Sequence, residues 1–309
     1  MHDDHQGRMV GIGDTQLWVV ERGDPGGYPL MLLHGGPGDD HHEFADYLDA
    51  LGDRYRLLLV DQRGNGRSMG SEPSTWTVQQ HAADVVLLAR ALRLERYAVL
   101  GHSYGAFVAL QNAVDFPAQA TQSIVSSGLG SVRWMADLEQ KLAAFEPEDL
   151  RAQVQESWAR EREVGTPEEF AQLMHDQMPW HFADPRDPRI ADYEERTSGA
   201  RYSPEMLRMA AGPVGEAAYG GIELEDRLGE IGHPVLVLAG RHDRTCPPEA
   251  AQVMAAGIPG AELEIFEHSG HMTFVEEPER YLEVVRDFLD RHSAEEETGR
   301  SASTDTAPA

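Results

Sequence analysis

Four short runs of the sequence are apolar at every position. They span residues 30–33, 57–60, 97–100 and 235–239. A strand with one face in water alternates apolar and polar residues, whereas a strand buried on both faces is apolar throughout. We therefore predict that these runs are the central strands of a mostly parallel sheet.

Helical patterns lie between these runs. Thr77 and Gln80 have the spacing of a capping box that opens a helix, and residues 105–116 form a second candidate. Pro278 suits the first turn of a third helix. The apolar residues after it have helical spacing: Tyr281, Val285, Phe288 and Leu289. Strands that alternate with helices predict an α/β fold with a doubly wound sheet.

The segment from residue 130 to residue 221 has a different pattern. It is rich in charge, methionine and tryptophan, is interrupted by seven prolines and has no run typical of a buried strand. Because sheet elements resume after it, we predict a mainly helical cap over 130–221, inserted into a core of residues 1–129 and 222–292. The small, polar, acidic tail 293–309 is expected to be disordered.

A Gly-x-Ser-x-Gly motif occupies residues 101–105, between the apolar run 97–100 and the predicted helix. This context is that of the nucleophile elbow of α/β hydrolases, in which a strained turn exposes the serine hydroxyl at a helix N-terminus. The flanking glycines avoid clashes within the turn. We therefore expect Ser103 to be the nucleophile of a serine hydrolase with the α/β-hydrolase fold.

A serine hydroxyl needs a base to become nucleophilic at neutral pH. In this fold the acid and then the histidine follow the serine along the chain. Asp243 follows the run at 235–239, and His271 follows a strand-like run at 262–266, so both lie at carboxyl ends of strands. We expect His271 to accept the proton of Ser103 and Asp243 to orient the imidazole.

Both assignments have a rival. His268 is close to His271 in the sequence, but it comes only two residues after the strand, whereas Gly270 lets the chain turn His271 back toward the sheet. Asp61 also ends a strand. It opens the polar, glycine-rich stretch 61–68, which is more simply explained as a tight structural turn.

The sequence His-Gly-Gly-Pro-Gly at residues 34–38 follows the run 30–33. Its glycines allow a backbone amide to face the nucleophile. We expect the N–H groups of Gly36 and Tyr104 to form an oxyanion hole, in which the loss of one donor typically costs about 3 kcal/mol in the transition state.

The net charge is −27, from 53 acidic and 26 basic side chains. Such a surface repels phosphate backbones and anionic lipids, so we exclude nucleic acid and membranes as partners. No apolar run approaches the roughly 18 residues that span a bilayer, and the first nine residues lack the apolar core of a signal peptide. We expect a soluble, cytoplasmic protein, which the single cysteine, Cys246, also fits. The oligomeric state is left open.

Residues of metal-ligating type occur in two clusters. One covers residues 2–5 in the terminal segment, and the other is the pair His41 and His42, which we interpret as a surface pair at the start of a helix. Cys246 is interpreted as a structural thiol. We expect no metal and no organic cofactor, because Ser-His-Asp chemistry supplies its own base and oxyanion donors.

The motif at 34–38, paired with Asp-Gln-Arg-Gly-Asn-Gly-Arg-Ser at 61–68, resembles proline iminopeptidases (prolyl aminopeptidases) and their close relatives. The resemblance also covers the elbow and the loops of Asp243 and His271, and it is weak across the cap. It implies an enzyme that releases an amino-terminal residue, often proline, from short peptides through an acyl-enzyme, without a metal or an organic cofactor.

The resemblance also implies one substrate-binding residue. Some relatives bind the substrate amino group through a Gly-Pro-x-Glu stretch, which is similar to residues 212–216 with one additional residue after Pro213. This similarity implies that Glu216 binds the substrate amino group. The alternative is a solvated surface glutamate.

The chain departs from the family pattern at two places. His102 and Tyr104 flank Ser103 where many proline iminopeptidases have Gly-Gly-Ser-Trp-Gly, and Arg244 stands where some relatives have a second carboxylate after the catalytic Asp. The first departure is shared with many esterases. An esterase or lactonase with the same triad is therefore the alternative function, and a binding protein that has lost catalysis ranks last because the triad is complete.

Overall fold

The computed structural model describes residues 7–210 and 222–303, with side chains as far as residue 293. Its centre is one sheet of eight strands: β1 (Gly7–Gly11), β2 (Gln16–Gly23), β3 (Tyr28–Leu33), β4 (Tyr55–Val60), β5 (Ala98–His102), β6 (Gln122–Ser126), β7 (Val235–Gly240) and β8 (Glu262–Phe266). Their spatial order is β1-β2-β4-β3-β5-β6-β7-β8. β2 is antiparallel to both of its neighbours, and the remaining strands are parallel.

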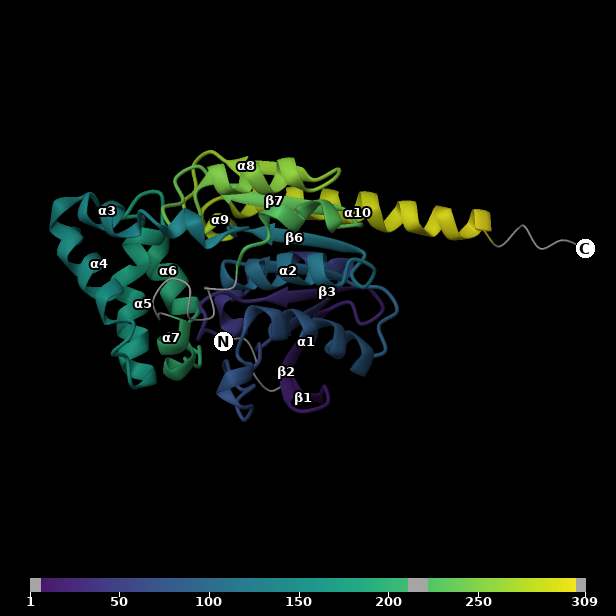
Figure 1. Cartoon of the computed structure of the whole chain (residues 1–309), viewed down its shortest axis with the longest axis horizontal. Coiled ribbons are helices and arrows are strands. Elements are labelled where there is room, and N and C mark those ends of the chain that lie inside the picture. Colours follow the sequence, from purple (N-terminus) through teal and green to yellow (C-terminus); the bar gives the residue numbers. More distant parts are fainter. Residues whose placement is uncertain (1–6, 211–221, 304–309) are drawn as a thin grey trace, which may run out of the picture.

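Helices cover both faces of this sheet (Figure 1). They are α1 (Val78–Ala91), α2 (Tyr104–Asp115), α8 (Pro248–Gly257) and α10 (Pro278–Ser303). In β3, Met31 and Leu33 pack with α1 and α2, whereas Leu30 and Leu32 pack in the layer of α10. Both faces are therefore dry, which explains why the runs 30–33, 57–60, 97–100 and 235–239 are apolar at every position.

The predicted doubly wound α/β sheet is confirmed, and each predicted apolar run overlaps β3, β4, β5 or β7. At α1, Thr77 caps the helix by accepting the N–H of Gln80 at 3.1 Å. The Gln80 side chain donates to Asp84 instead of returning to Thr77, so only half of the expected capping box forms. The apolar stripe of α10 is fully buried, as predicted.

One boundary differs from the expectation. α10 continues to Ser303 and so runs through much of the segment 293–309, for which we expected disorder. Its sequence there continues with alanine and glutamate, which are good helix formers, directly from a packed helix that has already formed its nucleus. Composition alone did not reveal this continuation.

Five helices lie together beyond one end of the sheet (Figure 1). They are α3 (Leu138–Ala143), α4 (Glu148–Arg160), α5 (Pro167–His181), α6 (Arg189–Arg196) and α7 (Pro204–Ala210). They occupy the segment expected to be a helical cap, of which residues 211–221 lie outside the described part. A β-bridge between Ser131 and Glu223 joins the two ends of this insertion.

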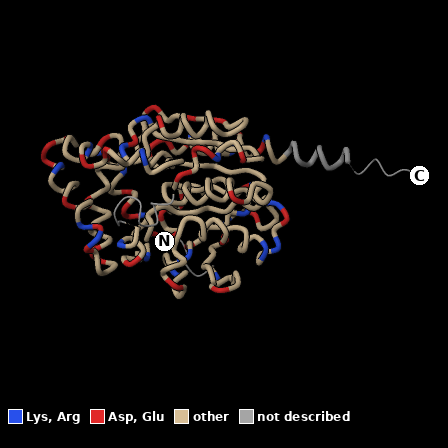
Figure 2. The backbone as a smooth tube through the Cα atoms, viewed as in Figure 1, with Lys and Arg blue, Asp and Glu red and all other residues tan. Residues whose placement is uncertain are grey.

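Acidic residues are spread over the core and the cap, with arginines among them (Figure 2). Several arginines join elements that are distant in the sequence, as Arg196 does with Asp46 and Arg286 does with Asp53. The negative charge is thus distributed along the described chain instead of being confined to one segment. Within the described ranges, no helix is both long enough and apolar enough to cross a bilayer.

Candidate active site

Ser103 lies in the turn between β5 and α2. Its backbone has φ 53° and ψ −117°, a conformation that non-glycine residues rarely adopt. Its N–H donates to the carbonyl of Ser126 on β6 at 3.0 Å, which helps to hold the strained turn. A Cβ at Gly101 would clash with the carbonyl of Gly105, and a Cβ at Gly105 would clash with that of Leu33. The elbow therefore requires both glycines.

Asp243 and His271 are hydrogen-bonded to each other. His271 Nδ1 lies 2.7 Å from Asp243 Oδ2, and both side chains are buried. The other carboxylate oxygen, Oδ1, accepts the backbone N–H groups of Thr245 at 2.9 Å and Cys246 at 2.8 Å. These bonds fix the orientation of the carboxylate and aim Oδ2 at the imidazole.

The loop that carries His271 is held on several sides. The N–H of His271 donates to the carbonyl of His181 at 2.7 Å, and Ser127 Oγ donates to the carbonyl of His271 at 2.9 Å. A Cβ at Gly240 would clash with the carbonyl of Gly270, so the loops after β7 and β8 are in direct contact. The position of the imidazole is therefore set by the core and by the end of α5 together.

Glu276 also positions this loop, and the sequence reasoning missed it. It ends the short helix α9 (Thr273–Glu276), and its carboxylate accepts the N–H groups of Gly270 and Ala183, each at 2.7 Å. Burial raises the pKa of Glu276 to about 7. The signal in the sequence was an acidic residue five positions after His271 in an otherwise apolar turn.

The two motifs that carry the family resemblance are bonded to each other. Gln62 donates its side-chain amide to the carbonyl of His34 at 2.7 Å, and its N–H lies 3.2 Å from His34 Nε2. Asn65 Oδ1 accepts the N–H of Gly38 at 2.7 Å. The loop 61–68 therefore acts as a support for the loop 34–38.

The loop 34–38 lies against Ser103. A Cβ at Gly35 would come within 2.9 Å of the Cβ of Ser103, and Gly36 has a φ of 96° that favours glycine. Gly36 and Ser103 line the same cavity. Tyr104 starts α2, and its hydroxyl lies 2.8 Å from His81 Nδ1 in the core, so only its backbone is available to the site.

The two rivals lie elsewhere. Asp61 accepts the N–H of Arg67 at 2.8 Å and lies 2.5 Å from His41 Nδ1, so its carboxylate holds the turn 61–68 together. His268 is exposed and does not line the cavity over Ser103. The preference for Asp243 and His271 is consistent with these placements.

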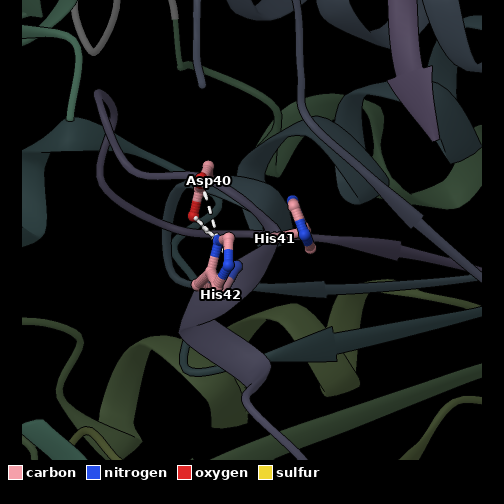
Figure 3. Close-up of side chains that lie close together, drawn as sticks. All are labelled: Asp40, His41 and His42. Atoms are coloured by element: carbon pink, nitrogen blue, oxygen red, sulfur yellow. Dashed lines mark hydrogen bonds and ion pairs between the residues drawn. The ribbon is translucent and has the colours of Figure 1, made fainter. Parts of the chain in front are cut away.

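Asp40, His41 and His42 have ligand-type atoms within 4.8 Å of one another (Figure 3). These atoms already make hydrogen bonds: His42 Nδ1 lies 2.9 Å from Asp40 Oδ1, and His41 Nδ1 lies 2.5 Å from Asp61 Oδ1. Asp40 Oδ2 also accepts the N–H of Arg201 at 3.0 Å. We interpret these hydrogen bonds as holding the loop after β3 against the cap. The interpretation of His41 as a surface residue is wrong, because its side chain is buried.

A cavity of about 910 Å³ lies over Ser103 and His271. Its far wall comes from the cap and is largely apolar, with contributions from Leu138, Leu142, Trp158, Phe170, Met174 and Leu207. Glu161 also lines it, and burial raises the pKa of this carboxyl to about 7. The cavity has the size and the apolar lining of a site for a small organic substrate.

A family model described as the alpha/beta hydrolase fold matches residues 28–278. This chain belongs to the α/β-hydrolase family. It is 31% identical to a proline iminopeptidase of Heyndrickxia coagulans, over 85% of this chain and 91% of the relative. It is 30% identical to a proline iminopeptidase of Lactobacillus crispatus, over 93% and 98% of the two chains.

Solved structures agree with this assignment. The proline iminopeptidase of Mycobacterium smegmatis is similar with a TM-score of 0.71 and 28% identity, covering 93% of this chain and 98% of its own. An esterase from Exiguobacterium antarcticum has a TM-score of 0.70 at 23% identity, with coverage of 92% and 99%. The latter likeness shows the fold alone.

The two departures from the family pattern have structural roles in this α/β hydrolase. Arg244 donates to the carbonyls of Trp180 at 3.1 Å and Phe182 at 2.6 Å, which ties the end of α5 to the Asp243 loop. The ring of His102 lies 5.1 Å from that of His271, and burial lowers the pKa of His102 well below its usual value. His102 is thus a neutral ring that packs beside His271.

Proposed function

We propose that this α/β hydrolase is an aminopeptidase of the proline iminopeptidase type, with Ser103 as nucleophile, His271 as general base and acid, and Asp243 as its orienting carboxylate. One observation carries the proposal: His271, hydrogen-bonded to Asp243, shares a cavity with Ser103 in a chain whose relatives are named proline iminopeptidases. The substrates are short peptides with a free amino end.

The geometry supports the following steps. With its Nδ1 proton donated to Asp243, His271 has Nε2 free to accept the proton of Ser103 as the hydroxyl attacks the scissile carbonyl. The N–H groups of Gly36 and Tyr104 stabilise the oxyanion. His271 then gives the proton to the leaving amine, which leaves an acyl-enzyme. Water, deprotonated by His271, hydrolyses this ester and regenerates Ser103. No step requires a metal or an organic cofactor.

A panel of chromogenic substrates tests the proposal. We expect the highest kcat/KM for an amide with amino-terminal proline, lower values for the alanine and leucine amides, and weaker hydrolysis of short acyl esters than a dedicated esterase would show. One feature favours the esterase or lactonase alternative: His102 and Tyr104 flank Ser103, as in many esterases. Strong esterase or lactonase activity without any amidase activity would contradict the aminopeptidase proposal.

Glu216 lies outside the described residues, and its role as the partner of the substrate amino group rests on its sequence context alone. We expect Glu216→Gln to lower kcat/KM for the proline amide about 10- to 100-fold, as for a lost charge-assisted hydrogen bond. Hydrolysis of a small uncharged ester should stay within about twofold, because the triad is unchanged. Equal losses on the two substrates would indicate a structural role.

A further inference from the structure

Two carboxyl groups lie beside the nucleophile on the loop after β3. Asp39 and Glu43 are each only 8% exposed, and both line the cavity that contains Ser103. Glu43 Oε2 accepts the N–H of Gly35 at 2.6 Å. A Cβ at Gly35 would lie 2.5 Å from Glu43 Oε1 and 2.9 Å from the Cβ of Ser103, so this carboxyl and the nucleophile flank the same glycine.

No cation balances this pair within the described residues. The Asp39 carboxyl has no hydrogen-bond donor and no arginine, lysine or histidine as an ion-pair partner there. Burial raises the pKa of Asp39 to about 7, with the Asp40 charge adding to the effect. Burial and the neighbouring Asp39 raise the pKa of Glu43 well above its usual value. Buried carboxylates are normally paired, so an unpaired one beside a nucleophile indicates a ligand site.

The surroundings suit a positively charged ligand. Next to the main cavity is a side chamber of about 340 Å³. The residues that line both spaces are Asp39, Glu43, Met174, Met178 and Tyr193. Tyr202 and Glu194 complete the acidic and aromatic part of the side chamber. Carboxylates together with tyrosine rings are groups that bind an organic ammonium, through charge-assisted hydrogen bonds and cation–π contacts.

We propose that Asp39 and Glu43 bind the protonated amino group of the substrate beside the bond that Ser103 attacks, and that they select substrates with a free amino end. The inference rests on the proposed function, because it takes Ser103 as the nucleophile. It adds Asp39 and Glu43, on the core loop after β3, to Glu216 of the cap segment as proposed partners of this amine, and the amide variants at the three positions test each contact separately. The ammonium supplies the positive countercharge that Asp39 and Glu43 do not find within the described protein, in a site where low dielectric strengthens the attraction.

The isosteric variants Asp39→Asn and Glu43→Gln test this assignment. Each should lower kcat/KM for the proline amide about 10- to 100-fold, mainly through KM, and change hydrolysis of a small neutral ester by less than about twofold. Glu195→Gln is the matched control: it removes one negative charge from an exposed position on α6 that lines neither space, so it should change neither substrate.

The variants should remain folded. The amide that Asp39→Asn introduces has the shape of the carboxyl it replaces, and the amide oxygen that Glu43→Gln introduces still accepts the N–H of Gly35. Because each substitution removes a buried carboxyl whose ionisation is costly in this site, the Tm should be equal to or above that of the wild type. Selective loss on the amine substrate with an unchanged or higher Tm supports the inference. Equal losses on the two substrates, or no loss on either, would overturn it.

A binding experiment separates this inference from the proposed function. L-Prolinamide is titrated calorimetrically into the Ser103→Ala protein, which cannot turn it over, and into the same protein carrying Asp39→Asn or Glu43→Gln. We expect the added substitution to raise Kd about 10- to 100-fold. If the wild type cleaves no amide, the aminopeptidase proposal fails, yet this weakened binding still supports the amine site. An unchanged Kd would refute the amine site whatever the activity of the wild type.

Discussion

Replacing Ser103 by alanine is expected to lower kcat by about 10⁶-fold on every substrate, the scale seen when a triad nucleophile is removed. The substitution deletes only the Oγ atom. The backbone of residue 103 stays in its strained turn, because the hydrogen bond to Ser126 and the glycines at 101 and 105 are unchanged. The Tm should therefore stay close to the wild-type value while the reaction stops.

Two measurements accompany the Ser103→Ala assay. A fluorophosphonate probe should label the wild type and should leave the variant unlabelled, which identifies the reactive hydroxyl and argues against a purely binding function. His271→Ala should be comparably severe, because triad members act as a unit. Near-wild-type turnover by the Ser103→Ala protein would refute the proposed mechanism.

The sequence pattern was informative where burial is complete and apolar. In the runs 30–33 of β3 and 57–60 of β4, residues alternate between two dry layers, so every position is apolar and the run is visible. β6 was missed because it is buried but partly polar. The hydroxyl of Ser123, the second residue of β6, is hydrogen-bonded to His233, 110 residues further along the chain. Such a partner is invisible to any local pattern, and it makes a buried strand look like a loop.

In the candidate site, too, some residues were predictable from the local sequence pattern and others were not. Ser103, Asp243 and His271 each follow a strand, so the position of a chemically active residue after an apolar run was enough to single them out. Asp39 and Glu43 belong to a run of polar residues that looks solvated in the sequence. The fold buries this run beneath the cap, where Arg201 donates its N–H to the neighbouring Asp40. Their burial depends on tertiary contacts that the sequence pattern does not encode.

Asp243→Asn is expected to lower kcat by about 10⁴-fold with little loss of stability, as for the equivalent change in a Ser-His-Asp enzyme. The reason lies in the two backbone N–H groups of Thr245 and Cys246, which donate to Asp243 Oδ1. They oblige an asparagine to place its carbonyl oxygen there and its NH₂ group toward His271 Nδ1. The opposite orientation would leave both N–H donors without an acceptor, at a cost of about 1–3 kcal/mol for each buried group.

The NH₂ group then dictates the tautomer of the histidine. Because it donates to Nδ1 of His271, the imidazole proton must move to Nε2, the atom that should accept the proton of Ser103. Asp243→Ala is the comparison: it also removes the acceptor of the two N–H groups, so it should lower both kcat and Tm. Measuring kcat and thermal unfolding for both variants separates two roles of Asp243: setting the tautomer of His271, and accepting the two backbone N–H groups of its own loop. An Asp243→Asn enzyme with wild-type kcat would show that this carboxylate does not set the protonation of His271.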